Sequence, residues 1–239
     1  MTSTTNAAAI PATSNLQPLW TRNDSFDLWR VSGFDSRSDA LIRCADVVLA
    51  GVTLIFISPV LVMICVAISI LDRGPVFFAH SRLGRAGQSF PCLKFRTMVC
   101  NADARLHALL DTDPEARRLW DLNQKLENDP RITWIGQFLR KSSLDELPQL
   151  INVLRGEMSL VGPRPITLAE VPRYGRYYAA YSSVRPGITG LWQVSGRNNV
   201  SYRRRVALDT TFVRRRSVGL YFKIIIGTIP AVISGSGSC

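Results

Sequence analysis

The sequence predicts a mainly α-helical fold with a small β-hairpin, attached to a membrane by a re-entrant helix. Three observations support this expectation: an uncharged apolar run with a central proline at residues 47–71, two strand-like segments around a turn, and apolar residues at helical spacing near residue 150. The 239 residues suffice for one domain with a sizeable core, so we expect one such unit with appendages.

The N-terminal stretch MTSTTNAAAIPATSN is small and polar and has few apolar side chains to bury. We therefore expect a disordered extension over residues 1–38. A signal peptide is not expected, because the apolar run begins late and is preceded by acids, among them Asp24, Asp27, Asp35 and Asp39.

The apolar run is long enough to cross a bilayer, for which about 20 residues suffice. Ser58 and Pro59 lie near its midpoint, where proline removes a backbone hydrogen bond and the serine hydroxyl can bind the freed carbonyl. Each half is too short to cross alone, and the basic flanks favour the cytoplasm for both ends. We therefore expect a re-entrant helix, broken at its middle, over residues 39–73, with flanking Arg30, Arg37, Arg43, Arg73, Arg82 and Arg85.

A soluble unit is expected over residues 74–217, beginning with a β-hairpin. Its strands are predicted at 76–82 and 89–98, on either side of the turn-like segment LGRAGQ. Since successive side chains of a strand alternate between faces, Lys94 and Arg96 should share one face.

Helices are expected in the rest of this unit. Residues 101–128 should form two helices, because the sequence Asp-Pro-Glu at 113–115 supplies a cap, a first-turn proline and a favourable acid. Residues 144–158 should form another that ends at Gly156 and buries Leu147, Leu150, Ile151 and Leu154. The apolar part of residues 218–239 is too short and interrupted to span, and we expect interfacial amphipathic helices there.

The composition narrows the class of protein. A formal net charge of +11 predicts a polyanionic partner, which could be nucleic acid, an anionic membrane surface or a phosphorylated substrate. The five cysteines contain no C-x-x-C pair, which argues against a zinc ribbon, and the two histidines argue against a zinc hydrolase. No phosphate-binding loop, dinucleotide fingerprint or nucleophile elbow is present in the sequence.

An acidic pair, Asp145 and Glu146, remains as the candidate for chemistry. One interpretation is structural, because Ser143 to Glu146 fits a capping box at the start of a helix. The other is functional, because carboxylates in a helix's first turn are stabilised as anions and can act as a nucleophile or as Mg²⁺ ligands. Arg140 and Lys141 lie just upstream and would counter the charge of an incoming phosphate.

Four separate motifs then establish a resemblance. The segments CLKFRTM at 92–98, DPRIT at 129–133, LRKSSLDELPQLINVLRGEMSLVGPRP at 139–165 and RPGITGLWQVSGRN at 185–198 resemble the monotopic phosphoglycosyl transferases among the bacterial sugar transferases. More narrowly, they resemble the undecaprenyl-phosphate galactose phosphotransferases that initiate exopolysaccharide synthesis. The similarity runs from about Phe34 to the C-terminus.

The resemblance implies that residues 74–217 form a cytoplasmic catalytic domain at the bacterial inner membrane. It implies that Asp145 attacks the β-phosphate of a UDP-sugar, that UMP leaves, and that undecaprenyl phosphate then takes the phosphosugar. Glu146 would act as the supporting acid or base, and Mg²⁺, bound at Asp145, would neutralise phosphate charge.

The basic residues and the membrane segment receive roles from the same resemblance. Arg140 and Arg164 would contact phosphate or uridine, and Lys94 and Arg96 are further candidates for substrate binding. Ser58 and Pro59 match the break in the family's membrane helix, and the arginine-rich C-terminal part suits an anionic phospholipid membrane. One departure is Tyr221, which stands near the position where the family has an acid.

Two rival interpretations are a membrane-anchored nucleic-acid-binding protein and a non-catalytic scaffold. The first explains the charge but not the acid pair, and the sequence contains no recognised nucleic-acid-binding motif, so we expect no nucleic-acid partner. The second leaves the acid pair without a purpose. Turnover of a nucleotide sugar with release of UMP would separate the enzyme from both.

Overall fold

The computed structural model describes residues 36–123, 126, 129–196 and 200–233. This part of the chain is mainly helical, as expected, and contains the predicted antiparallel hairpin. A second, parallel pair of short strands, β3 (Ser159–Val161) and β4 (Gly187–Thr189), was not predicted. Most of the expected extension at 1–38 lies outside the described residues.

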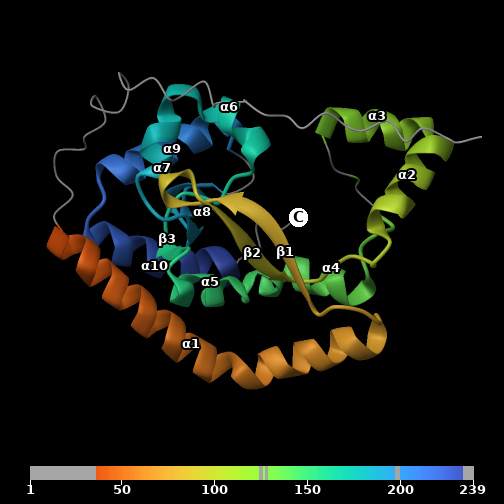
Figure 1. Cartoon of the computed structure of the whole chain (residues 1–239), viewed down its shortest axis with the longest axis horizontal. Helices are drawn as coiled ribbons and strands as arrows, with labels where there is room; N and C mark the ends of the chain where they lie inside the picture. The colour runs from red at the N-terminus through yellow and green to blue at the C-terminus, as the bar shows by residue number, and fades with distance from the viewer. Residues whose placement is uncertain (1–35, 124–125, 127–128, 197–199, 234–239) are drawn as a thin grey trace, which may run out of the picture. The chain divides into compact units, whose positions relative to one another are not determined.

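The first helix, α1 (Ser36–Leu71), is continuous and bends partway along its length (Figure 1). Pro59 lies inside it, and the Ser58 hydroxyl donates a 2.8 Å hydrogen bond to the carbonyl oxygen of Ile55. That carbonyl lies four residues before the proline, so it is the one left without a backbone donor. The expected rescue by Ser58 is confirmed, but the helix bends where a break was predicted. Re-entry into a membrane stays a prediction.

Two faces of α1 differ in their surroundings. The inner face packs on the protein through Ile42, Asp46, Ala50, Ile64 and Ile68, which are all buried. The outer face exposes large apolar side chains, and by length and composition α1 could cross a membrane. The most exposed are Ile55, Phe56, Met63 and Ile70.

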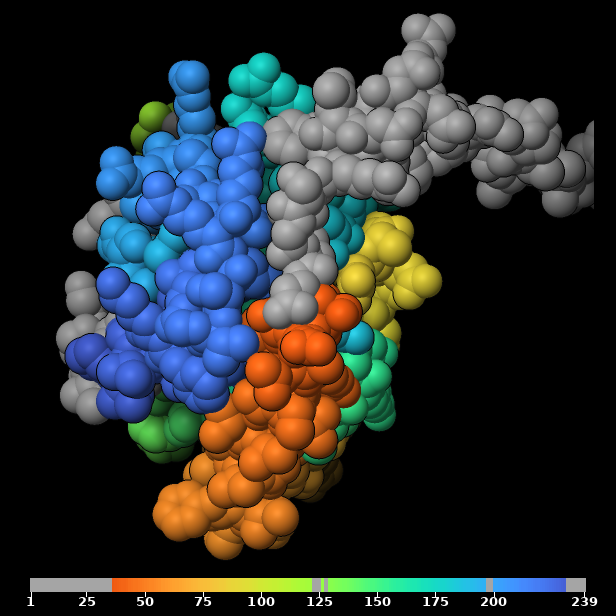
Figure 2. Space-filling view, turned by 90° about the vertical axis from the view of Figure 1, so that its left-hand side faces the viewer, coloured from red at the N-terminus to blue at the C-terminus, as the bar shows by residue number. Residues whose placement is uncertain are grey.

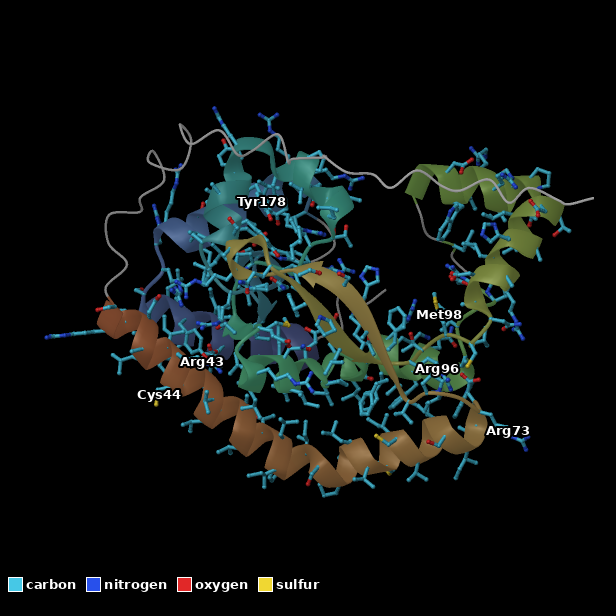
Figure 3. The ribbon with its side chains drawn as sticks, in the orientation of Figure 1. Arg43, Cys44, Arg73, Arg96, Met98 and Tyr178 are labelled. Atoms are coloured by element: carbon cyan, nitrogen blue, oxygen red, sulfur yellow. The ribbon has the colours of Figure 1, made fainter. Side chains whose placement is uncertain are left out.

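Polar contacts hold the N-terminal half of α1 against the protein. The Arg43 guanidinium donates hydrogen bonds of 2.7 Å and 3.0 Å to the carbonyl oxygens of Val153 and Leu154. Figure 3 shows Arg43 on the inner side of α1 and Cys44 pointing away. The C-terminal helix α10 (Val218–Ile233) packs beside this half of α1, as the blue and orange segments of Figure 2 show.

The hairpin consists of β1 (Phe77–Leu83) and β2 (Ser89–Phe95). Its register pairs Phe78 with Lys94, and Arg82 with Phe90. Since directly paired residues share a face and alternate residues of a strand do too, Arg82 lies on the same face as Lys94. β2 ends at Phe95, three residues before the predicted end.

The two helices predicted over residues 101–128 are present as α2 (Ala102–Thr112) and α3 (Pro114–Asn123). Between them, a carboxylate oxygen of Asp113 accepts hydrogen bonds from the backbone of Glu115 and Ala116, which confirms the predicted cap.

The helices near the acidic pair are α4 (Trp134–Lys141) and α5 (Gln149–Arg155). The short 3₁₀ turn η4 (Leu144–Glu146) lies between them. Gly156 ends α5 in the left-handed conformation at φ 84°, as predicted.

The remaining chain covers the other end of the hairpin. Its longest helix before α10 is α9 (Tyr202–Arg214), which carries the arginine run that starts at Arg203. The shorter elements are η3 (Arg85–Gly87), η5 (Leu168–Glu170), α6 (Val171–Tyr174), η6 (Gly175–Tyr177), α7 (Tyr178–Ser182) and α8 (Leu191–Val194).

Candidate active site

The acidic pair lies in η4, against β2. The Lys94 ammonium is 2.6 Å from Glu146 Oε1 and 3.5 Å from Asp145 Oδ2. Asp145 is 9% exposed, whereas Glu146 is only partly buried. The structure therefore brings Lys94 and both predicted catalytic acids to one place.

The interpretation of Ser143 to Glu146 as a capping box is wrong. Ser143 adopts a left-handed conformation at φ 57°, and its side chain makes no capping hydrogen bond. The Glu146 carboxylate binds Lys94 in place of a backbone amide. Because α5 begins only at Gln149, the acids also lie outside its first turn, and the expected stabilisation by the end of that helix does not apply. The left-handed backbone conformation of Ser143 is energetically costly for a residue other than glycine, and such conformations are frequent at functional sites.

The two acids ionise differently. Burial raises the pKa of the Asp145 carboxyl, and the nearby Glu146 charge adds to this, while Lys94 opposes it. Burial also acts to raise the pKa of Glu146, but its contact with Lys94 and the positive charges of Arg164 and Arg82 outweigh burial and lower it. Glu146 is therefore the more acidic group, and Asp145 is the one whose charge is held in a poorly solvated position.

The predicted basic residues separate into two groups. Arg140 donates a 2.9 Å hydrogen bond from Nε to Thr97, and its charge opposes the rise in the pKa of Asp145. The charge of Arg164 helps to lower the pKa of Glu146. Arg96, in contrast, is buried at the end of α1, where it binds Asp72 and the Cys100 sulfur. The structure thus places Lys94, Arg140 and Arg164 around the acids, but not Arg96. Figure 3 shows Arg96 near Arg73.

Arg82 also lies at this site, although the sequence predicted it only as a basic residue that flanks the membrane segment. It is largely buried, binds Glu170 at 3.4 Å, and its charge lowers the pKa of Glu146. The alternation of β1 would have placed it on the face of Lys94 once the hairpin register was known.

The acids suit a divalent cation only in one binding mode. No group of three or more acidic, histidine or cysteine side chains that could hold a metal occurs among the described residues. Mg²⁺ is often held by one or two carboxylates while substrate phosphates and waters fill its other positions. Asp145, beside the ion pair of Glu146 and Lys94, fits that mode.

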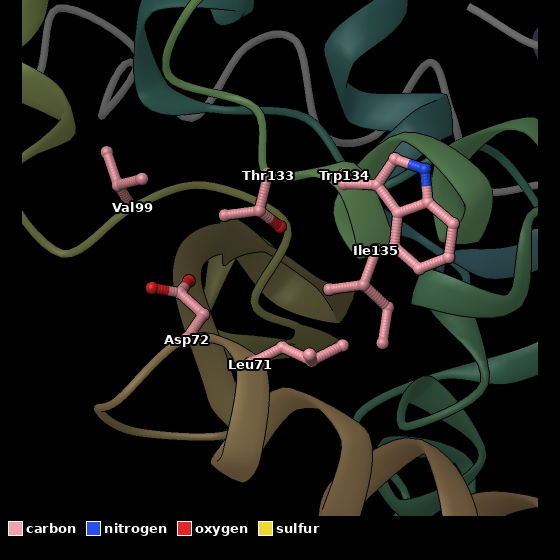
Figure 4. Close-up of a pocket in the computed structure, with 6 residues that line it drawn as sticks. All are labelled: Leu71, Asp72, Val99, Thr133, Trp134 and Ile135. Carbon is pink, nitrogen blue, oxygen red and sulfur yellow. The ribbon is translucent and has the colours of Figure 1, made fainter.

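A cavity of about 340 Å³ lies elsewhere, between the end of α1 and the start of α4 (Figure 4). None of the predicted catalytic or substrate-binding residues lines it. The lining residues are Leu71, Asp72, Val99, Thr133, Trp134 and Ile135.

An exposed apolar helix and a carboxylate pair among cations are features of a protein that acts on phosphorylated substrates at a membrane surface. The chain matches the bacterial sugar transferase family over residues 37–235, and it belongs to that family.

Relatives of known name agree with this family. The chain is 50% identical over 201 residues to an uncharacterized sugar transferase of Haemophilus influenzae, covering 84% of the chain and 42% of the relative. It is 48% identical to the exopolysaccharide production protein ExoY of Rhizobium meliloti, with 82% of the chain and 87% of the relative covered. It is 46% identical to an undecaprenyl-phosphate galactose phosphotransferase of Salmonella typhimurium, with 83% and 41% covered. The chain thus spans about two fifths of the first and third relatives.

Proposed function

We propose that this protein transfers a sugar-1-phosphate, galactose-1-phosphate in our assignment, from a UDP-sugar to undecaprenyl phosphate. This would be the first membrane step of exopolysaccharide synthesis. The observation that carries the proposal is the buried Asp145 beside the Glu146–Lys94 ion pair, within the segment that matches the family. The names of the Rhizobium and Salmonella relatives support the exopolysaccharide context, the lipid acceptor and the sugar.

The proposed first step is attack by an Asp145 carboxylate oxygen on the β-phosphorus of the UDP-sugar. A bond forms between that oxygen and phosphorus, the bond to the bridging oxygen breaks, and its electron pair leaves with UMP. In the second step, a phosphate oxygen of undecaprenyl phosphate attacks the same phosphorus and the bond to Asp145 breaks. The reaction needs charge neutralisation more than proton transfer, which agrees with the surrounding cations.

Each side chain has a task in this scheme. Lys94 lowers the pKa of Glu146 and opposes the burial that raises the pKa of Asp145, which favours the charged form of the nucleophile. Arg140, held by Thr97, is positioned to bind phosphate oxygens on the Asp145 side. A Mg²⁺ ion held by Asp145 and the substrate phosphates would supply further charge neutralisation when bound.

The membrane contact is part of the proposal, because the acceptor is a lipid. The exposed apolar face of α1 would lie in the inner membrane, with residues 74–217 on its cytoplasmic face. A water-soluble donor and a membrane-bound acceptor could then meet at the acids.

The test uses the full chain, purified in detergent, with Mg²⁺, undecaprenyl phosphate and a panel of UDP-sugars. We expect release of UMP and a lipid product with one sugar-1-phosphate, and UDP-galactose as the preferred donor. Turnover with another sugar alone would change the assigned sugar but not the reaction. No turnover with any UDP-sugar would contradict the proposal.

The covalent step has its own test. Without the lipid acceptor, the wild-type protein should release UMP and retain a phosphosugar, sensitive to hydroxylamine, on the peptide that contains Asp145. Asp145→Asn should lose turnover to background while remaining folded. Substantial turnover by Asp145→Asn, or no UMP release without acceptor, would favour direct transfer between the substrates.

A further inference from the structure

Three arginines from distant parts of the chain lie near one another, and one of them shares a face of the hairpin with Lys94. Arg82 comes from β1, Arg164 from the loop after β3, and Arg205 from α9. The pKa values of the Arg82 and Arg205 guanidinium groups are lowered, first by burial and then by the positive charge of Arg164. Placing like charges close together in a partly desolvated position is unfavourable unless a bound anion compensates them.

Contacts with neighbours hold two of the arginines in place. Arg82 binds Glu170 Oε2 at 3.4 Å and the carbonyl oxygen of Pro165 at 3.3 Å. Arg205 lies 4.2 Å from the ring centre of Trp192 and 5.4 Å from that of Tyr202. The Tyr202 hydroxyl donates a 3.4 Å hydrogen bond to the other oxygen of Glu170, so that one carboxylate links both arginines.

In the part of the chain that the structure describes, the contacts of this cluster leave Arg164 without an ion pair. The Glu170 carboxylate binds Arg82 directly and Arg205 only through Tyr202. Among the described residues, Arg164 forms no hydrogen bond or ion pair.

The Asp209 carboxyl interacts with Arg205 and Arg164, but burial raises its pKa to about 7. A hydrogen bond from Tyr174 and the charges of the two arginines oppose this rise. Two buried polar atoms, Arg205 Nε and Asp209 Oδ1, have no hydrogen-bond partner among the residues that the structure describes. Positive charge and hydrogen-bonding capacity are thus left over for a ligand.

The cluster adjoins the acids on the side of Glu146. Arg82 shares a face of the hairpin with Lys94, and the Lys94 ammonium lies 2.6 Å from Glu146 Oε1. An anion bound by Arg82, Arg164 and Arg205 would therefore lie on the same side of the hairpin as the acids and the reacting phosphorus.

The position of the cluster also indicates which anion it binds. The apolar residues around it, Leu83, Ile166, Tyr174, Tyr181 and Val206, include none from α1. In Figure 1 the hairpin rises from the end of α1 toward α7, and Arg82 lies in its far part. A lipid acceptor would approach from the exposed face of α1, so the opposite end suits the water-soluble donor.

We propose that Arg82 and Arg205, together with Arg164, bind the α-phosphate of the nucleotide and hold it as the phosphate monoester of UMP when it leaves. Trp192, Tyr202 and Glu170 position the arginines and do not touch the ligand. This assignment rests on the proposed function, since it assumes a uridine diphosphate donor.

The test is binding of UMP to the full chain in detergent, measured by calorimetry in the absence of a sugar donor. Arg82→Gln and Arg205→Gln should each weaken UMP binding by about tenfold or more, because each loses charge-assisted hydrogen bonds. Uridine, which lacks the phosphate, should bind the variants and the wild type alike. Arg173→Gln is the matched control, because Arg173 also stacks on Tyr202, at 5.0 Å, but is exposed.

Arg205 is partly buried, so Arg205→Lys provides a second variant that keeps the charge and should recover part of the affinity for UMP. Wild-type affinity in Arg82→Gln and Arg205→Gln would overturn the assignment. If these variants bound UMP as the wild type does but had a raised KM for undecaprenyl phosphate, the assignment would also be overturned. The cluster would then bind the acceptor phosphate. Absence of UMP binding by the wild-type protein would contradict the proposed uridine diphosphate donor. This result differs from failure of the arginine assignment, in which the wild type binds UMP and the variants bind it equally well.

Discussion

The Lys94 ammonium lies between two carboxylates that ionise differently. Its contact with Glu146 is short, at 2.6 Å, while Asp145 is 3.5 Å away and more buried. Burial acts to raise the pKa of both acids, and Lys94 opposes this at each. A single cation therefore opposes protonation of the proposed nucleophile in a place where a charge is otherwise unfavourable.

Lys94→Met should lower kcat/KM by roughly 100-fold, since an electrostatic contribution to phosphoryl transfer is lost. The pKa of Asp145 would rise without Lys94, and the ionised carboxylate is the reactive form. The acidic limb of the pH profile should consequently move to higher pH. Lys94→Arg should keep part of the activity, and Lys223→Met, on the exposed side of α10, should behave as wild type. An unchanged acidic limb in Lys94→Met would show that Lys94 does not control Asp145.

At the same scale, the sequence predicted the acids, Lys94, Arg140 and Arg164 through short motifs, and the structure brings these residues near one another. It failed where the answer depended on the end of an element. Arg96 was assigned to the face of Lys94 by alternation, but β2 ends at Phe95 and the chain turns the arginine toward Asp72. The capping box failed because Ser143 is left-handed, which no local pattern of L-residues predicts.

Among the elements, α1 was predicted well because its signals are local: an apolar run, a proline and a serine before it. Its bend follows from the missing donor at Pro59, with the Ser58 hydroxyl taking over the Ile55 carbonyl. The parallel pair of β3 and β4 was missed, because each strand has only three residues and their pairing joins segments far apart in the chain.

The bend in α1 leads to a prediction about topology. Cys44 and a cysteine placed at position 73 should both react with a membrane-impermeant reagent from the cytoplasmic side only, since basic flanks and a bent helix favour return. Figure 3 shows Cys44 and Arg73 pointing away from the protein. The other cysteines are replaced by serine or alanine. Pro59→Leu should straighten α1 and expose one probe to the opposite side in some molecules. Opposite-side labelling of the unaltered helix would contradict re-entry.

Helix α4 leads to a prediction about depth in the membrane. Trp134 is 81% exposed and Phe138 is 58% exposed, and their spacing places both on one face of the helix. We expect this face to lie in the lipid interface. In a variant that retains Trp134 as its single tryptophan, brominated phospholipids should quench the fluorescence strongly.

The matched control for that measurement retains Trp120 of α3, which stacks with Arg131 at 5.0 Å. Its fluorescence should be quenched weakly, since we expect α3 to lie away from the lipid. Equal quenching of the two tryptophans would show that α4 is not an interfacial helix.

Across the whole molecule, Asp46 joins α1 to the two other parts on which it packs. Its carboxylate accepts hydrogen bonds from the Ser159 hydroxyl at 3.0 Å, the Leu160 amide at 2.8 Å and the Tyr221 hydroxyl at 2.8 Å. From the sequence, Tyr221 was only a departure from the family's usual acid. Its partner lies 175 residues earlier, and such a pairing has no local signature.

The Asp46 contacts lead to a prediction about the stability of the whole protein. Tyr221→Phe removes one hydrogen bond to a buried charge and should lower the free energy of unfolding by about 1–3 kcal/mol. Asp46→Asn should cost more than Tyr221→Phe, because the neutral amide oxygen accepts weaker hydrogen bonds from all three donors. The measurement is thermal unfolding in one detergent, at fixed pH and protein concentration.

The double variant shows whether the two residues act together. If the Tyr221 hydroxyl stabilises the protein through Asp46, the loss in Asp46→Asn/Tyr221→Phe should be smaller than the sum of the single losses. Tyr178→Phe is the control, since Tyr178 stacks on Tyr181 and makes no contact with Asp46. Because this network fixes the helix that would carry the enzyme into the membrane, Tyr221→Phe should also increase proteolytic cleavage between α1 and β1 while the chemistry at Asp145 remains intact. Additive losses and unchanged cleavage would mean that α1 is held by its apolar packing alone.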